Sequence, residues 1–354
     1  MTGADPVLGV VLVAYDSGSV VLDCLESLRA ATGVRLRVVV VDNASTDGTP
    51  ARLADWAAGR LPWAPPPDSP IPLAASHTPL ALTPPGTCAP PDAGFALTLL
   101  QAAVNGGFAA GVNLGLAELA RDPAIERFWV LNPDSIVPPA TPRALATAPG
   151  GFGLMGGRIL YLERPDRIQI DGGRIDWRTG VTHNIHQYGR HPDTPAPDPA
   201  AFGFIHGASL VASRAFYDAT GPMAEDYFLY YEEVDWALRR GALPLAYCPG
   251  AVIYHRAGAS IGSGGPGRLA SPFSVYFMNR ARLRFVRRFR PGALPGAYLF
   301  SLAKAGQMLL KGAPAAAAAM LRAAHGLPPP AVVRRRLSPQ ALARVFGAQP
   351  RRRR

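Results

Sequence analysis

Residues 8–42, LGVVLVAYDSGSVVLDCLESLRAATGVRLRVVVVD, contain two valine-rich apolar runs on either side of a segment with helical spacing. The run at 8–15 is continuously apolar, which is typical of a parallel strand buried on both faces, and the valine-rich run at 36–41 predicts a second buried strand. Apolar residues at helical spacing predict a helix over 17–31, and a second helix is expected over 46–58. Strand, helix, strand and helix in this order predict a parallel sheet with right-handed crossovers.

Proline interrupts this pattern in residues 61–94. Eleven prolines in this stretch exclude a regular helix or a central strand, so we expect a surface excursion. Order resumes near 95–104, a helix is expected from about 105 to 120, and 127–131 has the pattern of another short buried strand. After Gly150 the sequence becomes strand-like and rich in loops. The 354 residues are sufficient for one large or two ordinary domains.

The remaining segments favour helices and then an irregular tail. Residues 227–240 have helical spacing, 278–290 form a basic helix candidate, and 298–310 form an amphipathic one. The final segment, 325–354, is rich in proline and arginine and is predicted to lack regular structure. No apolar run of about 18 residues occurs, so neither secretion nor a spanning helix is expected. The three cysteines lack metal-ligand spacing and indicate free thiols in a reducing compartment.

Charge is distributed very unevenly along the chain. All 25 acidic residues lie at or before Asp235, whereas 21 of the 36 basic residues follow it. The formal net charge of the whole chain is +11. Codon bias could explain the choice of arginine, but it does not easily explain the missing acids. This asymmetry favours an anionic partner for the C-terminal part: a membrane surface, a lipid-linked diphosphate or nucleic acid.

Polar residues follow three of the predicted strands. Asp42 ends the second strand, Asn105 opens a glycine-rich turn that enters a helix, and Asp134 follows the strand at 127–131. In parallel sheets, ligands bind beyond the carboxyl ends of the strands. A glycine-rich helix entry suits phosphate, and a carboxylate beside a serine suits Mg²⁺. Each cluster taken alone could equally be a helix cap or a turn.

An acidic cluster and two histidines add further candidates. Glu232, Glu233 and Asp235 follow a run of aromatic residues, which favours partial burial and raised pKa values suited to a base. On a helix, Glu232 and Asp235 share a face and Glu233 points elsewhere. His255 follows a strand-like run and could ligate a metal, whereas His206 favours a structural or acceptor-side role.

The order of these motifs is more specific than any one of them. In series, they resemble glycosyltransferase family 2, and most closely its bacterial rhamnosyltransferase-like branch, over roughly residues 7–290. The motifs are VVLVAYDS (10–17), VVVVDNASTDGT (38–49), NGGFAAGVNLGL (105–116), WVLNPDSIV (129–137), HGASLVASRAF (206–216), YFLYYEEVDWALR (227–239) and AVIYHRAGAS (251–260).

The resemblance implies an α/β GT-A fold, with a mostly parallel central sheet flanked by helices and a Rossmann-like nucleotide-binding half. The GT-A domain would span residues 1–290, with the nucleotide-binding half at about 1–150 and the acceptor half at about 151–290. Residues 291–354 would form a helical basic extension and a disordered Arg-rich tail. The insert at 61–94 has no role that the family suggests.

The resemblance also implies roles for individual residues. Glu233 would be the general base, with Glu232 or Asp235 as alternatives. A divalent metal, Mg²⁺ or Mn²⁺, would be held by Asp134 and His255, and His206 with Gly207 would lie on the acceptor side. The nucleotide-sugar side would comprise Ala14, Tyr15, Asp42, Asn43, Asn105, Gly107, Phe108, Asn113 and Asn132.

Three positions depart from the family pattern. Asp16 stands where asparagine is common, Asn132 replaces an acid at the start of the metal motif, and Glu233 replaces aspartate. The longer glutamate could shift the base or move its role to a neighbour. The mechanism implied is a single displacement that inverts the anomeric carbon, with the base taking the proton of the acceptor hydroxyl.

Other classes of protein remain as alternatives. A sugar nucleotidyltransferase would need a basic glycine-rich loop near the N-terminus, and residues 14–18 contain no lysine or arginine. A nucleic-acid-binding protein acting through the Arg-rich C-terminus lacks any zinc, helix-turn-helix or RRM pattern. A degenerate glycan-binding relative would have lost its metal site.

The basic C-terminal part also suggests a location. We expect a nucleotide diphosphate sugar donor, a glycan or lipid-linked acceptor in cell-surface polysaccharide synthesis, and an anionic membrane surface as partners; nucleic acid is not expected. Each arginine or lysine near such a surface contributes about 1 kcal/mol of attraction. The protein is therefore expected in the cytoplasm, attached peripherally to the inner face of the cytoplasmic membrane through 280–311 and the terminal arginines.

Overall fold

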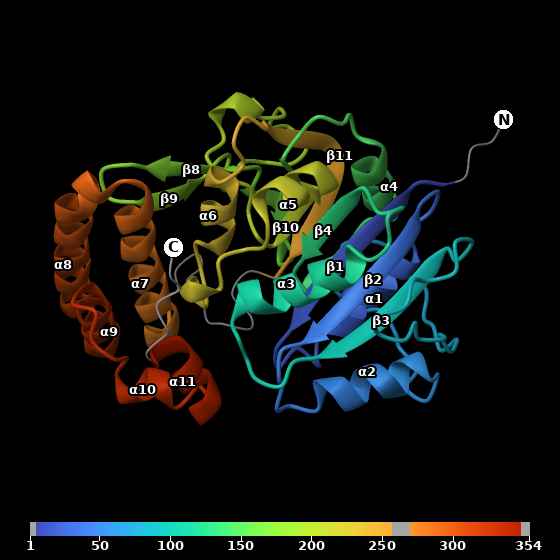
Figure 1. Ribbon diagram of the computed structural model, residues 1–354, viewed down its shortest axis with the longest axis horizontal. Coiled ribbons are helices and arrows are strands. Elements are labelled where there is room, and N and C mark those ends of the chain that lie inside the picture. Colours follow the sequence, from blue (N-terminus) through green and yellow to red (C-terminus); the bar gives the residue numbers. More distant parts are fainter. Residues whose placement is uncertain (1–4, 257–269, 348–354) are drawn as a thin grey trace.

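A computed structural model describes residues 5–256 and 270–347. Its centre is a nine-stranded sheet with helices on both faces, and a group of C-terminal helices stands beside it (Figure 1). The strands follow the order β3-β2-β1-β4-β10-β6-β11-β5, and β7 pairs with β6. The first four of these strands are mutually parallel: β3 (Phe95–Gln101), β2 (Arg35–Asp42), β1 (Val7–Ala14) and β4 (Arg127–Leu131).

The two valine-rich runs form the centre of this parallel half, as predicted. β1 and β2 pair in register from Val7 opposite Arg35 to Ala14 opposite Asp42, so their carboxyl ends meet at one edge. Alternate side chains point to opposite faces, and both faces are buried. One face packs against α1 (Val21–Arg29), α2 (Thr49–Ala57) and α4 (Thr141–Thr147), and the other packs against α3 (Phe108–Leu119).

Beyond β4 the sheet becomes mixed. β10 (Ser209–Ser213) runs antiparallel to β4 and to β6 (Leu154–Tyr161), whereas β11 (Leu245–His255) runs parallel to β6. β7, β5 and a separate β8–β9 hairpin complete this half, together with α5 and α6. Their bounds are β7 Arg164–Ile170, β5 Ser135–Ile136, β8 Gly173–Asp176, β9 Val181–Asn184, α5 Arg214–Thr220 and α6 Glu232–Leu238.

The proline-rich residues 61–94 contain neither helix nor strand. They pass over the outer side of α1 and α2 and form hydrogen bonds with both helices. The indole of Trp63 is buried and donates a hydrogen bond of 2.9 Å to Asp23 in α1, and Leu80 N–H donates to Ala57 O in α2. The insert therefore covers helices of the parallel half of the fold and lies away from the carboxyl edge of the sheet.

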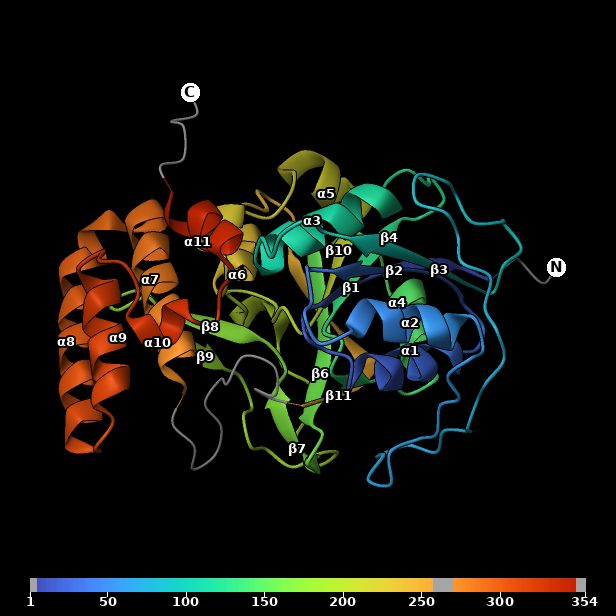
Figure 2. The same cartoon turned by 90° about the horizontal axis from the view of Figure 1, so that it is seen from below.

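The described C-terminal residues form five helices: α7 (Pro272–Phe289), α8 (Leu294–Leu310), α9 (Pro314–Ala324), α10 (Ala331–Arg334) and α11 (Pro339–Phe346). The long helices α7, α8 and α9 pack against one another (Figures 1 and 2). The expected boundary at residue 290 thus falls between two helices of one packed layer. Within the described ranges, no helix is both long and apolar enough to cross a bilayer.

The expectation that the segment from residue 325 onward lacks regular structure is wrong for α10 and α11. Val333, Leu337 and Ala341 are buried in a cluster with Phe277 and Met320, which places α10 and α11 against α7 and α9. These three apolar residues recur at every fourth position, but the surrounding arginines and prolines dominate the composition and conceal them. The arginines at 351–354 lie outside the described residues.

Gly107, at the start of α3, sets how closely two loops around the sheet edge can approach. It has a φ of +87°, and a Cβ there would overlap the carbonyl group of Phe228. The neighbouring Phe108 N–H donates a 2.9 Å hydrogen bond to the oxygen of that carbonyl. Only a residue without a Cβ fits between the two backbones.

We expect Gly107→Ala to lower the free energy of unfolding by about 3 kcal/mol, through backbone strain and a clash that no rotamer relieves. Gly86→Ala is the matched control, because Gly86 has a φ of +81° but nothing within 4 Å of its Cβ position. That control should lose only about 1 kcal/mol. Urea unfolding of both variants measures the difference, and equal losses would contradict the steric explanation.

Candidate active site

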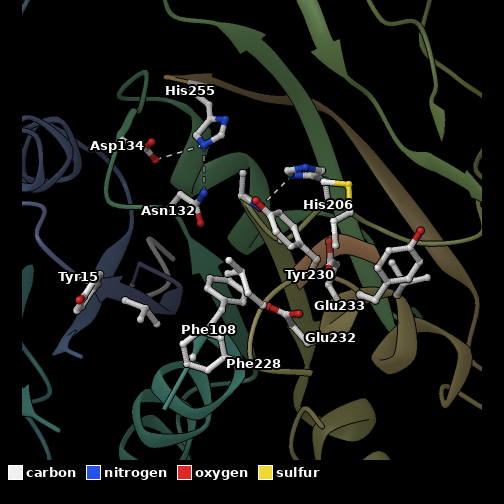
Figure 3. Close-up of a pocket in the computed structure, with 18 of the residues that line it drawn as sticks. Tyr15, Phe108, Asn132, Asp134, His206, Phe228, Tyr230, Glu232, Glu233 and His255 are labelled. Carbon is white, nitrogen blue, oxygen red and sulfur yellow. Dashed lines mark hydrogen bonds and ion pairs between the residues drawn. The ribbon is translucent and has the colours of Figure 1, made fainter. Parts of the chain in front are cut away.

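A cavity of about 440 Å³ lies beyond the carboxyl ends of the parallel strands. Its wall draws on both halves of the sheet, and Figure 3 shows side chains from the loop after β1 and from α3, β11 and α6 around it. Tyr15 and Glu233, which are distant in the sequence, thus face one space. The tertiary structure brings together here most of the residues singled out from the sequence.

Asparagine side chains organise one wall of the cavity. The Asn43 amide donates to Asn105 Oδ1 at 3.2 Å and to Gly107 O at 3.0 Å, which fixes the loop that enters α3. Tyr15 directly follows β1 and lies on the same side of the cavity. Its pKa is raised by burial and then by the charge of Asp16. A hydrogen bond to Asn105 opposes this rise. This wall presents hydroxyl, amide and small side chains to a ligand.

Three residues expected on this side do not line the cavity: Ala14, Asp42 and Asn113. Ala14 is buried in the core. The Asn113 side chain forms hydrogen bonds of 2.9 to 3.0 Å with the backbone of Met223 and with the Glu225 carboxylate. Asp42 is buried directly beside the wall, and its Oδ1 has no hydrogen-bond partner among the described residues.

Asp134 and His255 meet at a second wall. His255 Nε2 lies 3.2 Å from Asp134 Oδ1 and 3.1 Å from the amide nitrogen of Asn132 (Figure 3). On its other side, His255 Nδ1 lies 2.9 Å from Gln169 Oε1. With a carbonyl oxygen as that partner, Nδ1 carries the proton, and the unprotonated Nε2 accepts a hydrogen bond from the Asn132 amide beside the Asp134 carboxylate. All of these side chains except Gln169 were expected here from the sequence.

This pair fits a divalent cation. A carboxylate oxygen and an imidazole lone pair point at each other, an arrangement that a cation stabilises, and the Gln169 contact fixes the tautomer as partners of metal-bound histidines do. In the described parts of the chain, no cluster of three or more His, Cys, Asp or Glu side chains could hold a metal. A metal at this pair would complete its shell with water and substrate phosphate, as Mg²⁺ commonly does.

The acidic cluster divides between the cavity and the core. Glu232 and Glu233 both line the cavity, whereas Asp235 is fully buried and pairs with Arg239 at 2.7 Å and Arg288 at 2.6 Å. Asp235 therefore holds α6 to α7 and does not face the cavity. The sequence predicted that Glu232 and Asp235 share one helix face. In the structure Glu232 lines the cavity, whereas Asp235 does not.

Burial raises the pKa of Glu233 to about 7, against the hydrogen bonds that its carboxylate accepts from backbone amides, including that of Gly207. Burial, and then the charge of Glu233, raise the pKa of Glu232 well above its ordinary value. Glu232 Oε2 has no hydrogen-bond partner within the described structure. Burial therefore disfavours two charged carboxylates at this place and raises the pKa of both glutamates.

His206 and Gly207 lie beside Glu233 in the cavity wall. Burial, followed by the charge of His255, lowers the pKa of His206 to about 4, so its imidazole is neutral at physiological pH. Its Nδ1 accepts a 3.1 Å hydrogen bond from Ala208 N–H.

The backbone before α6 is not helical, which corrects the helix predicted over 227–240. Phe228, Tyr230 and Tyr231 have φ values near +70°, and the helix begins only at Glu232. The aromatic side chains pack into different clusters, so the chain turns sharply between them. Left-handed backbone at bulky residues costs free energy and concentrates at functional sites. Here it places the N-terminus of α6, with both glutamates, at the cavity.

A third wall was not found from the sequence. Tyr161, Gln169, Thr182, Asn184, Gln187 and Tyr188 line it, and they come from β6, β7, the β8–β9 hairpin and the turn after it. The rings of Tyr161 and Tyr188 stack 5.7 Å apart at an interplanar angle of 7°. These residues carry no local motif, because separate elements bring them together. Arg336, which also lines the cavity, was hidden among neighbouring arginines.

Comparison with known proteins finds similarity in sequence and in fold to glycosyltransferases. The family model described as glycosyl transferase family 2 matches residues 9–64, from β1 through α2. An N-acetylglucosaminyl-diphospho-decaprenol L-rhamnosyltransferase of Mycobacterium tuberculosis is 26% identical over 287 residues, covering 75% of this chain and 81% of that protein. The structure of GalNAc-T7 with UDP, GalNAc and Mn²⁺ superimposes with a TM-score of 0.53 at 10% identity, over 87% of this chain and 52% of that one.

The fold and the cavity define a glycosyltransferase with a GT-A fold. More narrowly, the chain resembles glycosyltransferase family 2, whose model matches residues 9–64, and within it the rhamnosyltransferase-like branch.

Proposed function

We propose that this enzyme transfers a sugar, with rhamnose as the first candidate, from a nucleotide diphosphate donor to a hydroxyl of a glycan or lipid-linked acceptor in cell-surface polysaccharide synthesis. The observation that carries the proposal is one cavity in which the Asp134–His255 pair and Glu233 face the asparagine-lined wall. The relative from Mycobacterium tuberculosis supports the choice of sugar and of acceptor class. The transfer is inverting and depends on a divalent metal.

In this proposal the donor occupies the wall formed by Tyr15, Asn43 and Asn105. The base of the nucleotide lies toward Asp42, whose buried Oδ1 is left to accept a hydrogen bond. Phe108, Gly107 and Asn132 lie between the base and the sugar. Asp134 and His255 would hold Mg²⁺ or Mn²⁺ against the diphosphate; the ion would neutralise the charge that develops on the leaving group.

Glu233 then serves as the base. Its pKa of about 7 leaves a substantial fraction ionised at neutral pH and able to accept a proton, as a general base must. Its carboxylate takes the proton of the acceptor hydroxyl while that oxygen attacks the anomeric carbon from the face opposite the diphosphate. Glu232, whose pKa is raised by burial and then by the charge of Glu233, keeps the charge of the pair low beside an anionic donor. Asp235 is no longer a candidate because its ion pairs occupy both carboxylate oxygens.

The acceptor would enter along the wall of Tyr161, Gln187 and Tyr188. The stacked tyrosines give a flat apolar surface with hydroxyl groups at its edge, which suits a sugar ring. His206 and Gly207 lie where this wall meets Glu233. In this proposal the acceptor hydroxyl reaches both the Glu233 carboxylate and the anomeric carbon of the donor.

Donor binding tests the proposal directly. We expect calorimetric titration with dTDP-rhamnose, UDP-hexoses and GDP-hexoses to find one donor that binds in Mn²⁺ or Mg²⁺ and not in EDTA. Transfer of that sugar to a lipid-linked diphosphate sugar would establish the acceptor class. Binding of no donor under any metal condition would overturn the proposed function.

We also propose that the protein attaches peripherally to the inner face of the cytoplasmic membrane through α7 and α8. Arg280 in α7 is half-buried, but α8 exposes an apolar face, with Leu299 at 63% and Leu310 at 92% exposure. No acidic residue follows Asp235, so nothing in this part of the sequence repels an anionic surface. The terminal arginines, which were expected to contribute, lie outside the described residues.

Replacing Leu299 and Leu310 together with glutamine should weaken binding to vesicles of anionic lipid about tenfold, since each leucine would bury its side chain in the interface. Leu82→Gln is the control, because Leu82 is also exposed (40%) but lies in the proline-rich insert. Co-sedimentation that does not depend on anionic lipid would contradict this attachment.

A further inference from the structure

The C-terminal segment 331–346 reaches the cavity. Arg336 and Leu337, which connect α10 to α11, line its wall together with Tyr15, Asn105 and Phe273 (α10 and α11 in Figure 2). The GT-A sheet and the C-terminal helices therefore share one site, although Arg336 is far along the chain from the strands that build the sheet. Neither the family match at residues 9–64 nor the sequence motifs include this segment.

Several contacts hold the segment at this position. Leu337 and Ala341 are buried, and the ring of Phe346 packs against Tyr276 and Phe277 of α7. Arg344 forms an ion pair of 2.7 Å with Glu225, the residue that also accepts a hydrogen bond from Asn113 in α3.

Arg344 also lies against the glycine-rich loop at the cavity edge. A Cβ placed on Gly106 would lie 3.1 Å from the Arg344 guanidinium carbon. The segment is thus packed against the loop that enters α3 as well as against α7. This double contact fixes Arg336 relative to the nucleotide side of the cavity.

The electrostatics of the cavity single out Arg336. Among the described residues, the carboxylates that line the wall are those of Asp134, Glu232 and Glu233. Within the same described lining, Arg336 is the one arginine or lysine that accompanies them. A diphosphate carries at least two negative charges, so this wall needs cationic groups to hold it.

The position of Arg336 suits that task. Its guanidinium lies 4.9 Å from the ring centroid of Phe273, a contact that orients the planar group. It is also close enough to Tyr15 for its charge to act on the phenol. The guanidinium therefore lies on the nucleotide side of the cavity, where its donors could reach phosphate oxygens in a bidentate manner.

We propose that Arg336 binds the diphosphate of the nucleotide donor, which makes the C-terminal helical segment a part of the donor site. This inference rests on the proposed function, because it assigns a residue to the same donor. The inference adds a second partner for the basic C-terminal part. Besides the membrane surface, this part would bind a ligand inside the catalytic cavity.

Calorimetric titration with dTDP, UDP and GDP in Mn²⁺ tests this assignment on the full-length chain. For the diphosphate that binds the wild-type protein, Arg336→Gln should weaken binding about 10- to 100-fold, the range for a lost charge-assisted hydrogen bond. Arg336→Lys keeps the charge without the fork and should recover part of the affinity. Arg335→Gln is the matched control, because Arg335 is the preceding residue, is exposed and does not line the cavity.

The outcomes separate the two proposals. If the wild-type protein binds no nucleoside diphosphate, both the proposed function and the role of Arg336 are overturned. If it binds one and Arg336→Gln binds it equally well, the role of Arg336 alone is overturned. Equal losses in the Arg336→Gln, Arg336→Lys and Arg335→Gln variants, with a lowered melting temperature, would attribute the effect to packing of the segment and also overturn the assignment.

Discussion

Replacing Glu233 with glutamine is expected to reduce the rate of sugar transfer by about 10²- to 10⁴-fold, the range that a positioned general base contributes. Glutamine keeps the size of the side chain and can still contact Gly207, but it cannot accept the proton of the acceptor hydroxyl. Donor binding should change little, because the donor is proposed to lie on the other side of the cavity. Single-turnover transfer and donor titration measure the two effects separately.

The dependence of the wild-type rate on pH follows from the same carboxylate. A base must be ionised to work, so kcat/KM should rise tenfold per pH unit at low pH and level off above a pKa of about 7. Because Glu232 and Glu233 interact, this apparent value belongs to the pair. In the Glu233→Gln variant the residual rate should lose this acidic limb.

Glu126→Gln provides the control, since Glu126 is exposed and lies outside the cavity. Its rate and pH profile should match those of the wild-type enzyme. If Glu233→Gln retains the wild-type rate while Glu232→Gln loses it, the base is Glu232, and the extra methylene at position 233 has moved the role to its neighbour.

Asp134→Ala is expected to abolish the metal dependence of donor binding and to weaken binding in Mn²⁺ by about 100-fold or more. Changes in the outer shell of a metal site already cost about 10- to 100-fold, and a direct carboxylate ligand contributes no less. The loss has a structural origin: His255 would keep its Gln169 contact at 2.9 Å but would face no carboxylate. Titration of the donor with Mn²⁺ and with EDTA measures the effect.

Two further variants serve as references for the loss of donor binding in Asp134→Ala. Gln169→Ala leaves both proposed ligands in place and removes only the group that orients His255, so its loss should be about 10-fold. Asp218→Ala removes an exposed carboxylate on α5, outside the cavity, and should bind the donor normally. Donor binding that stays metal-dependent in Asp134→Ala would mean that a metal is held elsewhere.

The sequence by itself determined the parallel half of the fold and the places where polar residues leave it. Valine-rich runs at 8–15 and 36–41 indicate buried strands, because strands covered on both faces are mostly apolar, and parallel pairing then brings their carboxyl ends to one edge. Tyr15, Asn43, Asn105 and Asp134 follow strands or open helices, so their arrival in one cavity could be predicted locally. The order of the motifs also indicated the family.

The tertiary structure alone decided which acidic residues face that cavity. Glu232, Glu233 and Asp235 look alike in the sequence, but the left-handed turn at Tyr230 and Tyr231 directs the start of α6 to the cavity. Asp235 is paired with Arg239, four residues further along the chain, and with Arg288 of α7. The pair with Arg288 joins two helices that are distant in the sequence, and no sequence periodicity reveals it.

The same holds for the wall of Tyr161 and Tyr188 and for Arg336. Their positions depend on how separate elements pack, and packing depends on the shapes of surfaces that are distant in the chain. Buried residues at 333, 337 and 341 place Arg336 at the cavity, while composition at those positions suggested a tail without structure. Local propensity and burial pattern therefore determined the strands and the motifs that follow them, and only long-range packing decided which side chains complete the site.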